Sequence, residues 1–352
     1  MVVVFYISGH GFGHASRSIE LLNVLAARRP DARLAVRTAA PLWLFHATAP
    51  KTVELAMVET DVGVVQIDSL NVDERETARR AARFYSAFDR RTDDEAAFLN
   101  AVRADVVLGD IPPLACAAAA RAGVASVAIG NFTWDWIYSG YEGFDRLAPG
   151  VVAAIRDAYA AASRALRLPM HGGFESMAAV TTDIPFIARR STREPADTRR
   201  LLGVPDDRPV VLVSFGGYGL SAPEVDYRAI AEAERLTVLA PGLDLPAPLT
   251  YQDLVAAADV VISKPGYGIV SECIANGTAL LFTSRGRFAE YEVFVAEMPR
   301  VLRCRYLPQP DLLAGRWGGA VRALLAQPSA PERPRIDGAE VAATAILDLA
   351  GG

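Results

Sequence analysis

The chain has 352 residues, a formal net charge of −5 and 51% hydrophobic residues. Single cores stop growing at about 250–300 residues, so this length predicts two domains. No apolar run reaches the roughly 18–20 residues that a membrane-spanning helix needs. No cluster of basic residues is interleaved with aromatic ones, as a nucleic-acid-binding surface would require. The composition therefore favours a globular protein with no transmembrane segment and no nucleic-acid partner.

The three cysteines, Cys116, Cys273 and Cys304, are odd in number and widely spaced. This spacing fits neither a disulfide framework nor a zinc site. We therefore expect the protein to work in a reducing compartment, the cytoplasm.

The first expected unit is a buried strand, Met1–Ser8, followed by a glycine-rich turn and an amphipathic helix. The turn reads GHGFGHASR over residues 9–17, and its glycines are wrongly spaced for a dinucleotide fingerprint. Two histidines, His10 and His14, follow the carboxyl end of the strand, where open parallel sheets bind their ligands. Either imidazole could instead hydrogen-bond the backbone of the turn.

The remainder of the first half alternates expected strands and helices. Expected strands cover 33–37, 53–55, 64–66, 105–108 and 124–129, and expected helices cover 41–45, 72–102 (one helix or a pair), 114–121 and 144–166.

Asp110 follows the expected strand 105–108 and lies in a loop before Pro112 and Pro113. In a parallel sheet its carboxylate would lie in the same crevice as His14. Alternatively, it caps the helix that one of the prolines begins.

Four aromatic rings follow the expected strand 124–129, in the run NFTWDWIY over residues 131–138. Such a patch, which includes Trp134 and Trp136, can stack on a sugar or an apolar acceptor. It can equally be packing between domains.

A segment rich in proline and arginine, 181–209, has the character of a linker. We place the first domain at 1–185, the linker at 186–208 and the second domain at 209–330. A C-terminal helix within 331–352 could cross back onto the first domain.

The second domain begins as the first does, with a strand at 209–214 and a glycine turn, FGGYG, at 215–219. Further expected elements are the strands 236–240, 278–283 and 301–303 and the helices 251–258 and 340–349.

The most informative stretch is a β-branched strand, Asp259–Ser263, followed by a turn with Gly266 and Gly268 and a helix to Ala275. Glycines let the backbone approach a ligand, and the start of a helix favours an anion such as phosphate. Glu272 lies about one and a half turns into the helix, where it can accept hydrogen bonds from a ribose diol. The spacing suits a nucleotide, although many parallel α/β proteins carry such a turn without phosphate.

Together these units predict an α/β chain with two Rossmann-like, doubly wound parallel-sheet domains facing a cleft. This architecture looks like that of the GT-B glycosyltransferases. Residues 258–275 resemble the donor-binding segment of the UDP-sugar transferases related to the cell-wall N-acetylglucosaminyltransferase, and residues 9–14 resemble their amino-terminal glycine loop. A closer similarity is to the glycosyltransferase-like N-terminal domain of plant L-arabinokinases, through 9–17, 110–117, 131–138 and 264–272.

By this resemblance, the second domain holds a nucleotide sugar, expected to be a UDP-sugar, and the first domain receives the acceptor. Glu290 takes the place of a glutamine that contacts the donor sugar in the cell-wall enzyme, which leaves the sugar open. Lys264 or Arg287 would neutralise the leaving diphosphate. The implied donor-binding residues are Gly217, Lys264, Gly266, Tyr267, Gly268, Glu272, Arg287 and Glu290, and the implied acceptor-side residues are Gly11, Gly13, His10, Trp134 and Trp136.

The implied function is a glycosyltransferase that uses no metal ion and no cofactor besides its nucleotide-sugar co-substrate. The acceptor, a small molecule or a glycan, needs a base, for which His14 is the first choice, with Asp110 as its orienting partner or as the base itself. A single base opposite the leaving group would invert the anomeric centre. Two alternatives stay open: a nucleotide-sugar epimerase or hydrolase, and a non-catalytic module that binds nucleotide sugars.

Overall fold

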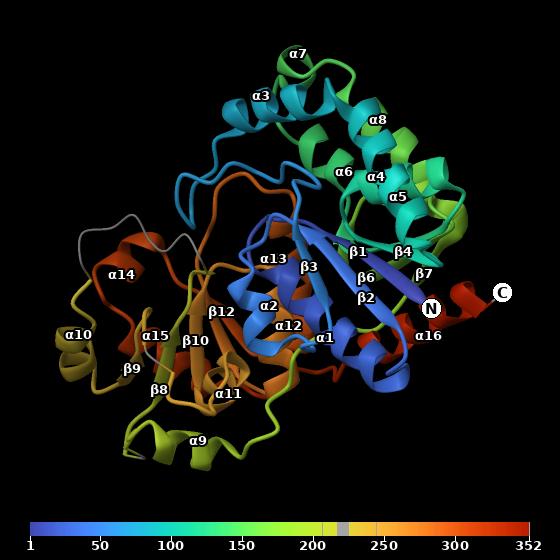
Figure 1. Cartoon of the computed structure of the whole chain (residues 1–352). Helices are drawn as coiled ribbons and strands as arrows, with labels where there is room; N and C mark the ends of the chain where they lie inside the picture. The colour runs from blue at the N-terminus through green and yellow to red at the C-terminus, as the bar shows by residue number, and fades with distance from the viewer. Residues whose placement is uncertain (206, 217–224, 244, 352) are drawn as a thin grey trace.

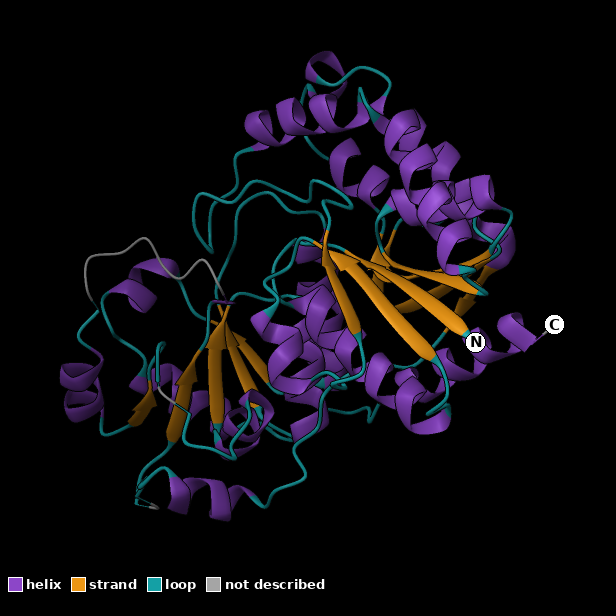
Figure 2. Cartoon of the chain, viewed as in Figure 1, coloured by secondary structure: helices purple, strands orange, loops and turns teal. Residues whose placement is uncertain are grey.

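The computed structural model describes residues 1–205, 207–216, 225–243 and 245–351. These residues form two α/β domains, each built on one sheet with helices against both faces (Figure 1). Figure 2 shows the two sheets as separate fans of strands. Every pairing between named strands in the described ranges is parallel. The predicted fold class, two doubly wound parallel-sheet domains, is therefore confirmed.

The first sheet has seven strands in the order β3-β2-β1-β4-β5-β6-β7. The strand order changes direction at β1, which lies between β2 and β4, and this switch point opens the crevice in which such sheets bind ligands. The strands are β1 Val2–Ile7, β2 Arg33–Thr38, β3 Glu54–Met57, β4 Val106–Asp110, β5 Ala125–Phe132, β6 Arg164–Gly172 and β7 Thr181–Asp183.

Helices cover both faces of this sheet because successive side chains of a strand point in opposite directions. On β1, Phe5 and Ile7 pack toward α1 (Gly13–Arg28) and α16 (Gly338–Gly351), whereas Val4 and Tyr6 pack toward α4 (Phe88–Val102) and α5 (Pro113–Ala122). The helical elements of this part of the chain are α1 Gly13–Arg28, α2 Trp43–Thr48, α3 Glu74–Tyr85, α4 Phe88–Val102, α5 Pro113–Ala122, α6 Trp134–Ser139, α7 Phe144–Leu147, α8 Val151–Ala160 and the 3-10 helix η1 Glu175–Val180.

The second sheet has five strands in the order β12-β11-β10-β8-β9, with its switch point between β10 and β8. Its strands are β8 Val210–Val213, β9 Thr237–Leu239, β10 Val260–Ser263, β11 Ala279–Phe282 and β12 Cys304–Tyr306. The helices of the second half are α9 Pro195–Leu201, α10 Tyr227–Glu234, α11 Tyr251–Ala257, α12 Tyr267–Asn276, α13 Glu290–Val301, α14 Gln309–Leu313, α15 Gly318–Leu325 and α16 Gly338–Gly351. None of the described helices is long and apolar enough to cross a membrane.

Three sequence-based expectations need correction. The helix expected over 144–166 ends early, because α8 stops at Ala160 and the alanine- and leucine-rich residues after it form β6 between β5 and β7. Pairing with two neighbours overrides the local helix preference there. The strand expected at 64–66 is only a single bridge between Gln66 and Val72. The strand expected at 301–303 lies at 304–306, since α13 extends to Val301.

Two segments join the domains. The chain leaves the first sheet after β7, and α9, within the expected linker, packs on α11 of the second domain. The C-terminal α16 returns to pack on α1, where Arg28 Nη1 donates to Thr344 Oγ1 at 2.8 Å.

A loop of the first domain, residues 64–72, also reaches the second domain. Ser69 Oγ donates to the carbonyl oxygen of Phe215 at 2.5 Å, and the backbone N–H of Gly286 donates to the carbonyl oxygen of Leu70 at 2.5 Å. Leu70 is buried among the apolar residues of the second domain. This loop therefore contacts the second domain at Phe215, after β8, and at Gly286, after β11.

Candidate active site

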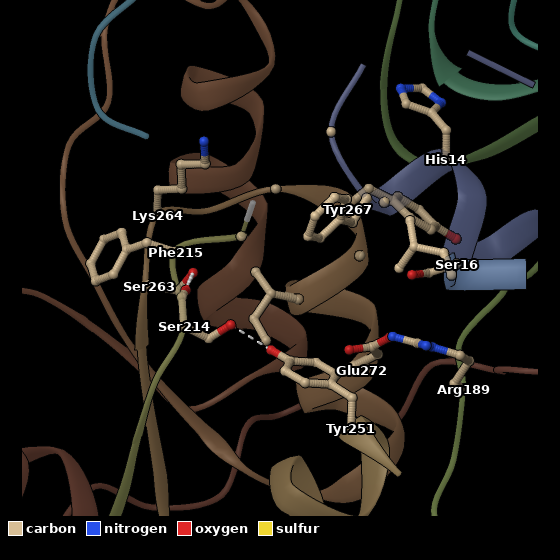
Figure 3. A pocket seen from close by; sticks show the side chains of 18 of the residues that line it. His14, Ser16, Arg189, Ser214, Phe215, Tyr251, Ser263, Lys264, Tyr267 and Glu272 are labelled. Carbon is tan, nitrogen blue, oxygen red and sulfur yellow. Dashed lines mark hydrogen bonds and ion pairs between the residues drawn. The ribbon is translucent and has the colours of Figure 1, made fainter. Parts of the chain in front are cut away.

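A cavity of about 570 Å³ lies between the carboxyl ends of the two sheets. Its walls come from the glycine turn before α1 in the first domain and from the turn before α12 in the second. Figure 3 shows His14 and Ser16 on one side of it and Lys264, Tyr267 and Glu272 on the other.

The starts of α1 and α12 meet at two glycines. A Cβ atom at Gly268 would lie 3.2 Å from the Cα of Gly13. Neither helix has a side-chain cap, since Phe12 and Gly266 occupy the N-cap positions without a side-chain hydrogen bond. First-turn N–H groups and helix dipoles from two domains therefore point into one cavity, which favours an anionic ligand.

His14 and Asp110 form a buried pair at the switch point of the first sheet. His14 Nδ1 lies 2.8 Å from Asp110 Oδ1, and both side chains are buried. Asp110 does not cap α5, because Pro112 is the N-cap residue there and provides no side-chain bond. Asp110 thus contacts His14, as an orienting partner would, and it does not cap a helix.

Three side chains on one face of α1 hold this carboxylate, because residues three and four positions apart share a helix face. Arg17 donates from Nε to Asp110 Oδ2 at 2.8 Å and from Nη2 to Oδ1 at 2.5 Å, and Ser18 Oγ donates to Oδ2 at 2.8 Å. Burial alone would raise the pKa of Asp110, but Arg17 and His14 hold it down to about 2. His14 Nδ1 also lies 2.9 Å from Arg17 Nη2, which can only donate, so the tautomer of His14 decides which of the two contacts is a hydrogen bond. In the tautomer with the proton on Nδ1, Asp110 accepts that proton and Nε2 keeps a free lone pair.

Glu272 lies on α12 at the cavity wall and pairs with Arg189 from the segment that joins the domains (Figure 3). Arg189 Nε donates to Glu272 Oε1 at 2.7 Å, and its Nη2 lies 2.5 Å from the same oxygen. Burial raises the pKa of Glu272, and the charge of Arg189 opposes that rise. Because both contacts use Oε1, the second oxygen can accept a hydrogen bond from a ligand.

Tyr267 is the first residue of α12 and is buried beneath the first domain. Its hydroxyl accepts a hydrogen bond from the backbone N–H of Ile187 at 2.9 Å, and the Arg17 guanidinium lies 5.0 Å from its ring centroid. The ring therefore packs the two domains together, while the backbone of its turn lines the cavity.

Two cations face the cavity from the second domain. Burial and then the nearby Arg285 lower the pKa of Lys264 to about 7, against the opposing charges of Asp68 and Glu290. Arg285 is itself buried, and its Nη1 lies 3.7 Å from Glu290 Oε2.

Arg287 does not share this position. Its side chain is 64% exposed and lies 3.7 Å from Glu74 and 3.9 Å from Glu142, outside the cavity. The cation that the loop after β11 contributes is Arg285 instead. Arg287 thus does not line the described cavity, and its expected contact with a diphosphate stays a prediction.

Glu290, at the first position of α13, contacts the first domain. Asn131 Nδ2 donates to Glu290 Oε1 at 2.6 Å, and both residues line the cavity. The carboxylate thus presents hydrogen-bond acceptors at the cavity wall.

Of the predicted acceptor-side side chains, His10 lines the cavity, whereas Trp134 and Trp136 do not. His10 lines the cavity, but its Nδ1 accepts from the backbone N–H of Val64 at 3.2 Å, and burial lowers its pKa well below the usual value. Trp134 is fully buried behind it and donates from Nε1 to Asp61 Oδ2 at 2.8 Å. Trp136 packs over Gly172. Neither tryptophan lines the cavity, so both serve as packing in this structure.

The remaining predicted positions are backbone positions. Gly11, with φ of +67°, and Gly13 line the cavity with the turn before α1. Gly217 lies outside the described residues, although its neighbours Phe215 and Gly216 line the cavity.

Sequence reasoning missed several side chains that build this site. Arg17 could have been found from its i, i+3 relation to His14. Asn131 begins the aromatic run 131–138, but the sequence alone suggested no role for it. No local sequence pattern distinguishes Arg189 or Arg285 from the other arginines. Asp61 is a further buried carboxylate near His14, and burial raises its pKa to about 6. Asp61 does not line the cavity.

No family model matches the chain. L-arabinokinase of Arabidopsis thaliana is 32% identical over 372 residues, an alignment that covers 100% of this chain and 35% of that protein. The chain thus spans about a third of the length of this relative. The predicted similarity to L-arabinokinases is confirmed.

Two solved glycosyltransferases have the same arrangement of domains over almost the whole chain. The calicheamicin glycosyltransferase CalG4 matches with a TM-score of 0.61 and 17% identity, over 99% of this chain and 98% of that one. UGT2 of Phytolacca americana, solved with UDP-2fluoro-glucose and pterostilbene, matches with a TM-score of 0.57 and 13% identity, over 99% and 94%. At these identities the likeness shows the fold, which is the GT-B glycosyltransferase fold.

Proposed function

We propose that the chain is a glycosyltransferase that moves a sugar from a nucleotide sugar to an acceptor hydroxyl. One observation carries the proposal: a single cavity joins the His14–Asp110 pair of one domain to the glycine turn and Glu272 of the other. A base and an anion-binding turn are the two parts that glycosyl transfer from a nucleotide diphosphate needs.

The donor would bind at the second domain. The N–H groups at the start of α12 would hold the diphosphate, and Oε2 of Glu272 would accept a hydrogen bond from a ribose hydroxyl. The donor analogue in the plant UGT2 structure carries UDP, so UDP is the first nucleotide to test. Glu290 would face the sugar.

Departure of the sugar leaves negative charge on the diphosphate. Lys264 is half-buried and the side chain of Arg285 is buried beside the cavity, and two helix starts point into it. Fixed donors and cations of this kind stabilise a developing anion in a site from which water is excluded. We therefore propose that the reaction needs no metal ion.

His14 would take the proton of the acceptor hydroxyl through Nε2, while Asp110 holds Nδ1 and stabilises the imidazolium that forms. With its pKa held near 2, Asp110 is a poor base at neutral pH and serves as the orienting partner. Attack from the side opposite the diphosphate would invert the anomeric centre.

The test is a binding screen of the whole chain with UDP, dTDP, ADP and GDP and their glucose conjugates, in the presence of EDTA. A ligand that binds only the folded state, present at a hundredfold excess over its Kd, stabilises the protein by about 2.7 kcal/mol, which raises Tm measurably. Binding of one nucleotide family would support the proposal, and binding of none would refute it.

The screen continues with a reaction assay on the nucleotide that binds. Release of the nucleoside diphosphate only when acceptor alcohols are added would indicate transfer. Release with water alone would indicate a hydrolase, a change of the sugar without release would indicate an epimerase, and binding without any change would indicate a non-catalytic module.

A further inference from the structure

We propose that Asn131 is a positioning residue that turns the Glu290 carboxylate toward the sugar of a bound nucleotide sugar; this inference rests on the proposed function. Asn131 lies near the end of β5 in the first domain, and Glu290 begins α13 in the second. The two side chains are 1% and 5% exposed and are joined by the 2.6 Å bond from Asn131 Nδ2 to Glu290 Oε1.

The amide of Asn131 has only one satisfactory orientation. Arg17 Nη1 donates to its Oδ1 at 2.9 Å, while its Nδ2 donates to the carboxylate. If the amide were rotated by half a turn, its NH₂ would face the guanidinium and its oxygen would face the carboxylate. One contact would then bring two donors together, and the other would bring two acceptors together. Arg17 thus fixes the amide, and the amide fixes Oε1 of Glu290.

This arrangement determines which oxygen of Glu290 a ligand meets. Oε1 accepts from Asn131, whereas Arg285 Nη1 lies 3.7 Å from Oε2, beyond hydrogen-bond distance. An ionised carboxylate only accepts hydrogen bonds, so Oε2 suits the hydroxyl of a sugar. Hydrogen bonds to a charged group depend strongly on direction and are stronger than neutral ones.

The Arg17 guanidinium also holds Asp110, the partner of the proposed general base His14. Arg17 bonds Asn131 through Nη1 and Asp110 through Nε and Nη2, and Asp110 contacts His14. One buried chain of hydrogen bonds therefore runs from the proposed base in the first domain to the sugar-facing carboxylate in the second. Asn131 is its link across the domain boundary.

The experiment compares two dissociation constants for each variant, one for UDP and one for UDP-sugars (glucose, galactose and N-acetylglucosamine). If another nucleotide bound in the screen, its diphosphate and glucose conjugate replace UDP. For Asn131→Ala we expect the ratio of the sugar-nucleotide Kd to the diphosphate Kd to rise about tenfold, the effect of one misdirected charged hydrogen bond. The Kd of the diphosphate itself should stay the same, since Asn131 lies at the sugar end.

A reciprocal exchange tests the bond itself. Asn131→Asp places two carboxylates side by side and should raise the ratio at least as far as Asn131→Ala. Adding Glu290→Gln restores both bonds, because Asp at 131 accepts from Arg17 and from the new amide. The double variant should therefore have a lower ratio than Asn131→Asp alone, despite carrying one more substitution.

Asn23→Ala is the matched control, since Asn23 donates a side-chain bond to the Thr48 carbonyl outside this chain of contacts. It should leave the ratio unchanged, and thermal melts should show that each variant is folded. Should Asn131→Asp not fold, Asn131→Ala decides alone. An equal loss of diphosphate and sugar-nucleotide affinity, or an unchanged ratio, would overturn the inference while leaving the proposed function intact. A wild-type protein that binds no nucleotide would instead overturn the proposed function, and the inference with it.

Discussion

Gly13 and Gly268 touch across the domain boundary at the starts of α1 and α12. A Cβ atom at Gly268 would lie 3.2 Å from the Gly13 Cα, whereas a Cβ atom at Gly13 would lie 3.7 Å from the nearest atom of Gly268. The first distance is tighter than ordinary van der Waals contact and the second is not. A side chain therefore fits at position 13 but is too close to its neighbour at position 268.

This inequality predicts different effects of alanine at the two positions. Gly268→Ala should lower the free energy of unfolding by about 1 kcal/mol, because the two helix starts must move apart. Gly13→Ala should be neutral or slightly stabilising, since alanine favours a helix over glycine by roughly 0.5–1 kcal/mol. Urea unfolding of both variants measures this, and equal destabilisation by both would contradict the contact described.

Arg285 and Arg287 provide a matched pair two residues apart. Arg285→Gln should weaken binding of a nucleoside diphosphate about tenfold or more, because it removes a buried charge beside the anion. Arg287→Gln should change the affinity little, since exposed ion pairs contribute about 0–1 kcal/mol and this side chain lies outside the cavity. Isothermal titration of both variants decides which arginine faces the ligand, and the reverse order of effects would mean that Arg287 rather than Arg285 does so.

Lys264 should make donor binding depend on pH. Its pKa is lowered to about 7, so near neutrality the amine is only partly protonated. A bound diphosphate favours the charged form and raises that pKa, so binding takes up protons and the affinity falls as pH rises above 7. Titrations in buffers of different ionisation enthalpy should show proton uptake on binding of a nucleotide sugar. This uptake should disappear in Lys264→Gln, and uptake of the same size in the variant would contradict the assignment.

Asp110 should contribute to stability at neutral pH. Its folded pKa of about 2 lies below its unfolded value, so the contribution is present above pH 4 and is lost as pH falls toward 2. A shift of this size corresponds to about 2 kcal/mol, of which about half is lost by pH 3. The difference in unfolding free energy between the wild type and Asp110→Asn should therefore shrink between pH 5 and pH 3. A difference that stays constant would mean that the carboxylate is not held ionised.

The sequence predicted the local units of the fold well because their signals are local. The glycine turns before α1 and α12 each follow a β-branched strand, and β1, β10 and α12 lie within a residue or two of their predicted ranges. β6 was missed because its alanine- and leucine-rich residues favour a helix locally. Two neighbouring strands, distant in sequence, decide its conformation.

The site was predictable only in part, for a related reason. His14 and Asp110 each follow a strand that ends at the same edge of a sheet, so topology alone brings them together. The choice between Arg285 and Arg287 depends on the path of an irregular loop, which no periodicity reveals. The role proposed for Asn131 depends on its contact with Glu290, 159 residues away in the other domain.

Turnover by the wild type and by His14→Ala tests the central claim most directly. The assay measures release of the nucleoside diphosphate from the nucleotide sugar that binds, with an acceptor alcohol present, alongside the Kd of that donor. We predict an unchanged Kd and a rate reduced by about 10²–10⁴-fold, the contribution of a general base. A variant that keeps its rate, or that loses binding and turnover together, would contradict the assignment of His14 as the base in this cavity.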